Sequence, residues 1–254
     1  MEPSRQVRVL GVDVVDEPFE AAVARLRALL DERRGAKVFF VNAHTLNQAA
    51  DDPAYRRTLN GADVVFGDGT GVRWAARARG VRLKANLNGT DLVPALLRAR
   101  PGTRVFLLGS TAERIGRAAE TFARLFPDCV LAGAHHGYVD DTASAAVVEA
   151  VNASGSELLL VGMGNPLQER WIARWGPMLD VPAAMAVGGL LEYWTGALER
   201  APRWMRRQGV EWLHILLRQP WKARRYLLGN PAFLARLLLW LPQDLKAARS
   251  PAHG

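Results

Sequence analysis

Cysteine is nearly absent from this chain of 254 residues, which contains Cys129 alone. One thiol excludes an internal disulfide and a metal cluster built from thiolates, and it is typical of a reducing compartment. No apolar run reaches the ~18 to 20 residues that a membrane-spanning helix needs. The first residues, MEPSRQVRVLGVDVV, lack the continuous apolar core of a signal peptide. We therefore expect a cytoplasmic protein whose membrane contact, where there is any, is peripheral.

Several motifs that mark common enzyme classes are missing as well. The chain has no G-x-S-x-G elbow, no G-x-G-x-x-G or G-x-x-x-x-G-K-[ST] after a strand, and no D-x-D pair. These absences argue against α/β-hydrolases, dinucleotide oxidoreductases, P-loop enzymes and a metal-bridged diphosphate. His135 and His136 have no carboxylate at ligand spacing, so we interpret them as a surface turn before Gly137. We expect neither a metal nor a cofactor.

Positive charge is concentrated in the last fifth of the chain. The whole sequence has a net charge of +8, and residues 200–254 hold eleven Lys and Arg against Glu211 and Asp244, which leaves residues 1–199 at about −1. Leucines and tryptophans are interleaved with these cations, and three prolines stand where short helices can begin. Basic amphipathic helices of this composition are typical of a membrane interface. A helical cap with solvated arginines and a nucleic-acid surface are the alternatives.

Short β-branched or Leu-rich runs alternate with longer segments of helical periodicity, such as 17–34 and 111–126. The runs are VRVLGVDVV, KVFFVN, DVVF, RVFLLG, ELLLVG and PAAMAV. This alternation predicts an α/β fold with a Rossmann-like, mostly parallel sheet flanked by helices. We expect two parts, an α/β catalytic core over 1–199 and a basic helical appendage over 200–254 that contacts membrane or acceptor.

Ligands of such folds bind past the carboxyl ends of the strands. Four loops at these places are rich in polar residues and glycine: NAHTLN, GDGTG, GMGNPLQE and GGLLE. In GDGTG, Asp68 stands between two glycines, which leave room for a ligand to approach its carboxylate. Asp68 could act as a general base or orient a sugar. The alternative is a simple turn, in which Asp-Gly is common. Asn42, His44, Thr45 and Asn47 could hydrogen-bond a sugar or base, or simply cap a helix.

The GMGNPLQE loop has the features of a phosphate site. Gly162 and Gly164 stand at a strand exit, Asn165 is the expected N-cap, and Pro166 is expected at the first helical position. Backbone N–H groups at such a helix start bind anions. The alternative is a tight turn in which the glycines only permit left-handed dihedral angles.

Taken together, TLN at 45–47, GDGTG at 67–71, NGTDL at 88–92, GMGNPLQERW at 162–171 and VGGLLEYWTGALERAPRW at 187–204 resemble one family. It is the WecG/TagA/CpsF glycosyltransferases, glycosyltransferase family 26. The continuation VEWLHILLRQPWKARRYL resembles the basic C-terminal appendage of that family. The resemblance covers residues 8–228, and the ordered set of motifs is more specific than any single motif.

The resemblance implies an inverting, metal-independent transfer of an N-acetylhexosamine-type sugar, such as ManNAc or ManNAcA. The donor would be a UDP-sugar and the acceptor a polyprenyl-diphosphate-linked sugar at the inner face of the cell membrane, in teichoic acid or exopolysaccharide synthesis. Asp68 matches the proposed catalytic base. The expected substrate-binding residues are Thr45, Asn47, Gly69, Asn86, Asp91, Gly162, Gly164, Gln168, Glu169 and Glu192, and those expected at the membrane and diphosphate are Arg203, Arg207, Arg218, Arg224 and Arg225.

Three positions depart from the pattern of the family. Asn86 stands where an Arg is common, Glu192 where Asp is usual, and Ile215 where an Arg commonly follows the EWL stretch. These departures bear on the donor and its diphosphate. Asn86 keeps open an inactive assembly subunit of the same fold. The arginines of the C-terminal segment keep open a nucleic-acid-binding protein, although we expect no nucleic-acid partner. A homo-oligomer is left open.

Overall fold

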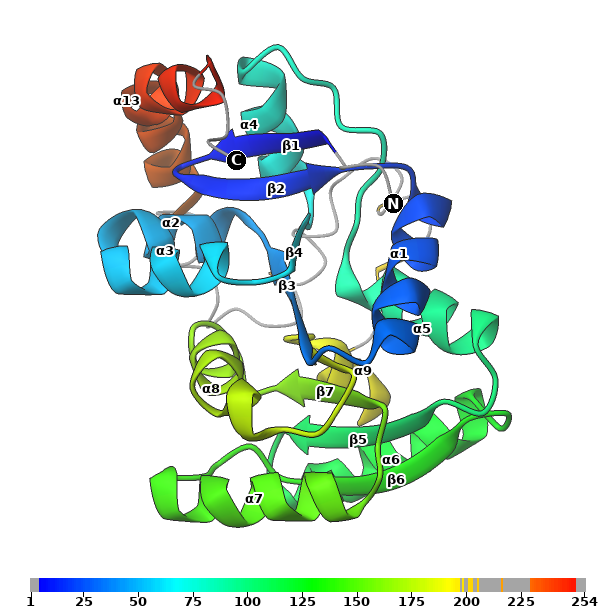
Figure 1. The fold of residues 1–254 in the computed structure, drawn as a ribbon. Helices are drawn as coiled ribbons and strands as arrows, with labels where there is room; N and C mark the ends of the chain where they lie inside the picture. The colour runs from blue at the N-terminus through cyan, green and yellow to red at the C-terminus, as the bar shows by residue number, and fades with distance from the viewer. Residues whose placement is uncertain are drawn as a thin grey trace.

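The protein folds as one eight-stranded sheet covered by helices on both faces (Figure 1). The computed structural model describes residues 5–196, 198, 201, 202, 205, 216 and 229–249, and of residues 246–249 the backbone alone. The strand order is β1-β2-β4-β3-β8-β7-β5-β6, and every neighbouring pair is parallel except β1 with β2. The predicted fold class, α/β with a mostly parallel sheet, is confirmed.

The central strands follow the predicted apolar runs, because a parallel strand buried on both faces reads as a continuous hydrophobic segment. They are β3 Ala36–Val41, β4 Val64–Gly67, β5 Arg104–Gly109, β7 Leu158–Gly162 and β8 Ala183–Ala186. Two features differ from the prediction. The run VRVLGVDVV forms a hairpin of β1 Arg5–Val9 and β2 Val12–Asp16, turning at Leu10 and Gly11 with positive φ angles. β6 Val130–His135, an edge strand without fully buried residues, was not predicted.

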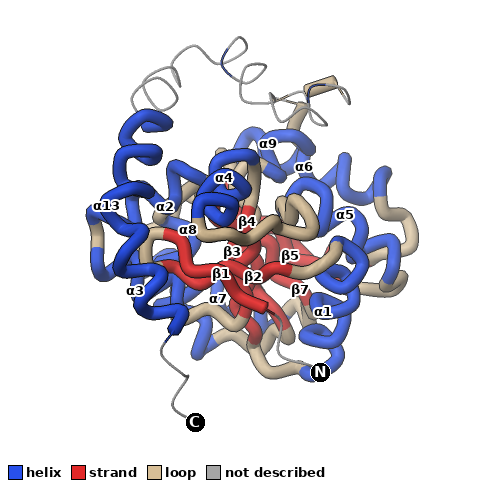
Figure 2. The backbone as a smooth tube through the Cα atoms, turned by 90° about the horizontal axis from the view of Figure 1, so that it is seen from above, coloured by secondary structure: helices blue, strands red, loops and turns tan. Residues whose placement is uncertain are grey.

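Two helical layers enclose the sheet (Figure 2). Each layer packs its own hydrophobic cluster against one face. The first layer contains α2 Ala43–Asp51, α3 Pro53–Asn60, α4 Thr70–Ala78, α7 Asp141–Ala153, α8 Leu167–Trp175 and α13 Gly229–Arg249. The second contains α1 Phe19–Glu32, α5 Gly89–Ala99, α6 Ala112–Leu125 and α9 Leu190–Trp194, and a 3-10 turn, Gly176–Met178, follows α8.

The helices expected over 17–34 and 111–126 are present as α1 and α6. On α6, Thr111 accepts a hydrogen bond from the backbone N–H of Arg114, the usual N-cap arrangement. Ile115, Ala118 and Phe122 follow at spacings of three and four and are buried. Apolar side chains at this spacing share one face, so the helix covers the sheet with that face.

The last helix, α13, packs on the body beside α4 and β1 (Figure 1). Phe233 and Leu237 are 2% and 5% exposed and belong to the core of the first layer. Asp244 accepts hydrogen bonds from the backbone N–H groups of Leu10 and Gly11, both at 3.0 Å, and pairs with Arg79. The chain from 229 to 249 is thus part of the folded body. No helix in the described ranges is long and apolar enough to cross a membrane.

Candidate active site

The four polar loops follow four neighbouring strands, β4, β3, β8 and β7. Parallel strands end at the same edge of a sheet, so these loops and the helices they lead into share one edge. Neighbouring strands lie about 4.8 Å apart, so the exits of β4 and β7 are separated by about 14 Å. A ligand that reaches from Asp68 to the Gly164 loop must therefore be extended.

The loop after β3 starts α2 by capping. Asn42 Oδ1 accepts hydrogen bonds from the backbone N–H groups of His44 at 3.0 Å and Thr45 at 3.2 Å. Thr45, completely buried, directs its hydroxyl to the same oxygen at 3.3 Å. Asn47 Nδ2 donates to the carbonyl of Gly229 at 2.8 Å, and Arg236 donates to the Asn47 carbonyl at 2.9 Å. Capping thus accounts for Asn42, and Asn47 joins the loop side of α2 to α13.

Asp68 directly follows β4 and is half-buried. Its backbone N–H donates to the carbonyl of Val41 at 2.8 Å, which fixes the exit of β4 against that of β3. Gly69 has a φ of +88° and donates its N–H to Asn86 Oδ1 at 2.7 Å. A Cβ on Gly71 would lie 2.9 Å from the Cβ of Ala43, so glycine lets the starts of α4 and α2 meet. Asp68 therefore lies beside two helix N-termini.

The loop after β7 begins its helix later than expected. α8 starts at Leu167 with Pro166 in the cap position, and no side chain caps it, so the prediction of Asn165 as N-cap is wrong. Asn165 Nδ2 instead donates to Glu169 Oε1, because this buried carboxylate requires donors. Gln168 is 1% exposed, and its Oε1 accepts from the backbone N–H groups of Gly164 at 3.2 Å and Gly188 at 3.0 Å. Gln168 thereby joins the β7 and β8 loops.

Glu192, on α9 after β8, contacts a fifth loop. Its Oε1 accepts from the hydroxyl of Ser110 at 2.9 Å, and its Oε2 lies 3.3 Å from Arg114 Nη1. Ser110 follows β5, and its backbone N–H donates to the Gly162 carbonyl at 3.2 Å. Sequence reasoning missed Ser110 and Arg114. The strand-end rule would have found Ser110, since it directly follows the apolar run RVFLLG.

Asp91 belongs to the start of α5. Asn88 Oδ1 accepts from the backbone N–H of Asp91 at 2.9 Å, and Asn88 Nδ2 donates to Asp91 Oδ2 at 2.8 Å. Gly89 lies against the ring of Phe40, where a Cβ would come within 3.2 Å. This pair orders the helix that follows Asn86.

His135 ends β6 rather than lying in a turn, and its Nδ1 is 2.8 Å from the carbonyl of His136. The strand extends to His135 because Leu108 of β5 pairs with it. In the described part of the chain, no group of three or more His, Cys, Asp or Glu could hold a metal ion. The expected site residues Arg203, Arg207, Arg218, Arg224 and Arg225, and the departure at Ile215, lie outside the described residues.

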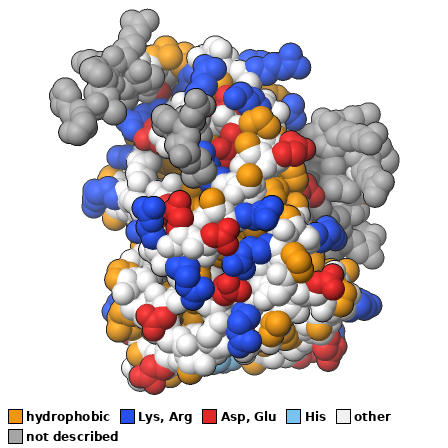
Figure 3. All heavy atoms as spheres, turned by 45° about the vertical axis from the view of Figure 1, so that its right-hand side comes forward, with side chains coloured by type: hydrophobic (Ala, Val, Ile, Leu, Met, Phe, Trp, Pro, Cys, Tyr) orange, Lys and Arg blue, Asp and Glu red, His pale blue; other side chains and the backbone are white. Residues whose placement is uncertain are grey.

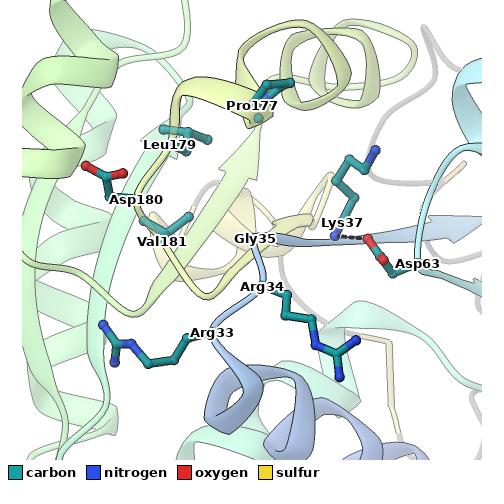
Figure 4. Close-up of a pocket in the computed structure, with 10 residues that line it drawn as sticks. Arg33, Arg34, Gly35, Lys37, Asp63, Pro177, Leu179, Asp180 and Val181 are labelled. Atoms are coloured by element: carbon teal, nitrogen blue, oxygen red, sulfur yellow. Dashed lines mark hydrogen bonds between the residues drawn. The ribbon is translucent and has the colours of Figure 1, made fainter.

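A cavity of about 550 Å³ opens at the opposite edge of the sheet, between the starts of β3 and β8. Three cations line it, but the guanidinium groups of Arg33 and Arg34 point apart (Figure 4). Arg33 lies 3.9 Å from Glu157, and Arg34 lies 3.3 Å from Glu32. The face in Figure 3 likewise mixes Lys and Arg with Asp and Glu. We therefore locate the candidate site at the carboxyl edge.

Polar loops and helix N-termini meet at the carboxyl edge of the parallel sheet, which is where α/β enzymes commonly bind their substrates. The comparison with known families is more specific. Residues 7–247 match the model of the family described as "Glycosyl transferase WecG/TagA/CpsF family". The chain belongs to this family.

Two curated relatives carry the same name, "N-acetylglucosaminyldiphosphoundecaprenol N-acetyl-beta-D-mannosaminyltransferase". The protein from Bacillus spizizenii is 30% identical over 230 residues, which cover 89% of this chain and 88% of the relative. The protein from Staphylococcus aureus strain MW2 is 30% identical over 236 residues, covering 91% of this chain and 92% of the relative.

Proposed function

We propose that this protein is a UDP-sugar-dependent glycosyltransferase that moves an N-acetylhexosamine, such as N-acetylmannosamine, onto a polyprenyl-diphosphate-linked sugar. The names of the two relatives support this acceptor and this type of sugar. The observation that carries the proposal is the single edge at which the loops of β4, β3, β8 and β7 meet. At this edge the Asp68 carboxylate lies three strands away from the glycine loop of β7, a separation that an extended sugar nucleotide can span.

In the proposed reaction the Asp68 carboxylate takes the proton of an acceptor hydroxyl. The hydroxyl oxygen forms its bond to the anomeric carbon while the bond from that carbon to the UDP oxygen breaks, and UDP leaves with the electron pair. One displacement of this kind inverts the anomeric configuration. Because no metal is invoked, the N–H groups at the starts of α2, α4 and α8 and arginines of the segment 203–225 would stabilise the diphosphate.

The membrane-facing part of the proposal rests on sequence. The segment 203–228 carries most of the excess positive charge, and the proposed acceptor has a lipid tail. We propose that this segment docks the enzyme on the inner face of the cell membrane, beside the body to which α13 also belongs.

Replacing the proposed base tests the mechanism directly. Asp68→Asn keeps the size of the side chain and removes its basicity, so turnover of UDP-N-acetylmannosamine with a polyprenyl-diphosphate-GlcNAc acceptor should fall about 10² to 10⁴-fold. Mass spectrometry of the lipid product and release of UDP measure the rate. The matched control is Asp180→Asn, at the opposite edge of the sheet and exposed.

Two outcomes would count against the proposal. Turnover of Asp68→Asn near that of the wild type, with UDP binding intact, would exclude Asp68 as the base. A wild-type protein that binds UDP but releases none from any UDP-sugar would instead be an inactive assembly subunit, for which the departure at Asn86 is the reason in the sequence.

A further inference from the structure

Glu169 is a glutamate with no exposed surface, held by side chains from two helices and a loop. Its Oε1 accepts from Gln168 Nε2 at 2.7 Å and from Asn165 Nδ2, and its Oε2 accepts from the hydroxyl of Tyr55 at 3.1 Å. All three partners offer a hydrogen to the carboxyl group. The carboxylate form of Glu169 accepts all three of these hydrogen bonds.

The neighbours of Gln168 select one orientation of its amide. On one side are the backbone N–H groups of Gly164 and Gly188, which need an oxygen. On the other side is Glu169 Oε1, which needs an N–H group. Rotating the amide by 180° would place two N–H groups against the glycines and two oxygens together, losing three hydrogen bonds. Glu169 thus holds the amide oxygen of Gln168 toward the two glycine loops.

Tyr55 reaches this network from α3, which contributes none of the four polar loops. The tyrosine is 1% exposed, and Arg170 stacks over its ring with the guanidinium carbon 5.7 Å from the ring centre. Arg170 also pairs with Asp52, whose carboxylate caps the start of α3. Arg170 therefore holds one face of the ring, and the hydroxyl of Tyr55 contacts Glu169.

We propose that Tyr55 and Glu169 are positioning residues for the sugar-nucleotide site, acting through the amide of Gln168 on Gly164 and Gly188. This inference rests on the proposed function. Glu169, expected from the sequence to bind substrate, acts here one layer behind it. Gly164 and Gly188 have positive φ angles and hold their loops at the exits of β7 and β8. Without Tyr55 and Glu169, the amide of Gln168 no longer bridges Gly164 and Gly188 at a fixed spacing. We therefore expect a larger effect on donor binding than on the rate of the chemical step.

The test uses the full-length protein and a variant that removes one oxygen. Tyr55→Phe keeps the ring and its contact with Arg170 and deletes the hydroxyl that donates to Glu169. We expect the dissociation constant of UDP, measured by calorimetry, and the KM of the donor to rise about three- to tenfold, with kcat changed less than twofold. Tyr138→Phe is the matched control, since Tyr138 is 76% exposed.

A pair of substitutions at Glu169 separates positioning from packing. Glu169→Leu removes every acceptor and should weaken UDP binding more than tenfold, whereas Glu169→Gln retains one acceptor for Gln168 Nε2 and should restore part of the affinity. In the same variants, NMR hydrogen exchange of the Gly164 and Gly188 amides reports on the bridge without any substrate. Exchange should accelerate about tenfold in Tyr55→Phe.

The readouts distinguish the two proposals. A wild-type protein that neither binds UDP nor transfers sugar would overturn the proposed function and, with it, the role of this network in a sugar-nucleotide site. If the wild type binds UDP and Tyr55→Phe binds it equally well with unchanged glycine exchange, the positioning inference alone is wrong. Equal losses in Glu169→Leu and Glu169→Gln would also overturn it.

Discussion

Two glutamates in this protein experience opposite effects of their surroundings. Burial raises the pKa of Glu169, and its hydrogen bonds from Gln168 and Tyr55 oppose that effect only in part. Hydrogen bonding to Arg100 lowers the pKa of Glu157, with further help from the backbone N–H of Arg104. Glu157 accepts from Arg100 at 2.9 Å and directly precedes β7, which pairs with β5. Ionised Glu157 therefore stabilises the fold, whereas burial disfavours the ionised form of Glu169.

The sign of the pH dependence follows for Glu157. Its pKa is lower in the folded state than in the unfolded chain, so its stabilising effect is present above the ordinary value of 4.5 and is lost as pH falls through the folded value. We expect Glu157→Gln to lower the free energy of unfolding by about 1 kcal/mol at neutral pH and by less at pH 3. Urea unfolding across this range measures the difference. A deficit that does not shrink toward acid, or that equals the deficit of the exposed control Glu149→Gln, would contradict this origin.

At the same scale, several polar side chains of the predicted ligand-binding loops form hydrogen bonds within the protein. Asn42 caps α2, Asn165 donates to Glu169, and Asn47 bonds to α13. Sequence reasoning located their loops correctly because strand ends are readable from apolar runs. The sequence could not distinguish loop residues that face a ligand from those that bond within the protein. That distinction depends on contacts with residues distant in sequence, such as Gly229 and Tyr55.

At the scale of elements, α13 connects two distant parts of the body. Its side chains Phe233 and Leu237 enter the core, and a Cβ on Gly71 would lie 3.5 Å from the ring of Phe233. This end of α13 therefore lies beside the loop of Asp68. The other end bonds to the turn of the β1–β2 hairpin through Asp244. A single helix thus ties the edge of the sheet to the site.

The Asp244–Arg79 ion pair contributes to this attachment. The two side chains are 2% and 4% exposed, so removing the carboxylate leaves a buried guanidinium without its charge partner. Asp244→Ala should lower the free energy of unfolding by about 3 to 5 kcal/mol. Denaturant unfolding measures this, and Asp180→Ala is the control. Because a buried apolar pair avoids the unpaired charge, Arg79→Met with Asp244→Leu should lose less than Asp244→Ala does; a larger loss would refute the ion-pair explanation.

Most strands of the sheet could be predicted from buried apolar runs, whereas β6 and the division of the first run into the β1–β2 hairpin were missed. Leu158 to Val161 are all buried, so β7 reads as an apolar run and is recognised. β6 lies on an edge of the sheet, where Val130 is 42% exposed, so its sequence does not form a continuous apolar run. The β1–β2 hairpin was read as one run because Gly11 interrupts it by a turn of only two residues.

At the scale of the whole molecule, the basic segment is bounded on both sides by buried parts of the body. Ala201 is 3% exposed just before the segment 203–228, and Phe233 is 2% exposed shortly after it. Deleting everything after Ala201 would therefore remove α13 along with the segment and expose the apolar surface beneath Phe233 and Leu237. Such a truncation would aggregate, and loss of vesicle binding by it would carry no information on the membrane.

Substitutions within the segment test membrane docking without disturbing α13. Arg224 and Arg225 lie outside the described residues and carry the charge that we propose meets anionic lipid. Each basic residue near such a surface contributes about 1 kcal/mol, so changing both to Gln should weaken binding to phosphatidylglycerol vesicles about thirtyfold. Arg117→Gln with Arg124→Gln, both exposed on α6, makes the same change in net charge elsewhere. Equal losses in the two pairs would mean that net charge alone drives binding, whereas tight, salt-sensitive binding to DNA and none to vesicles would favour a nucleic-acid partner.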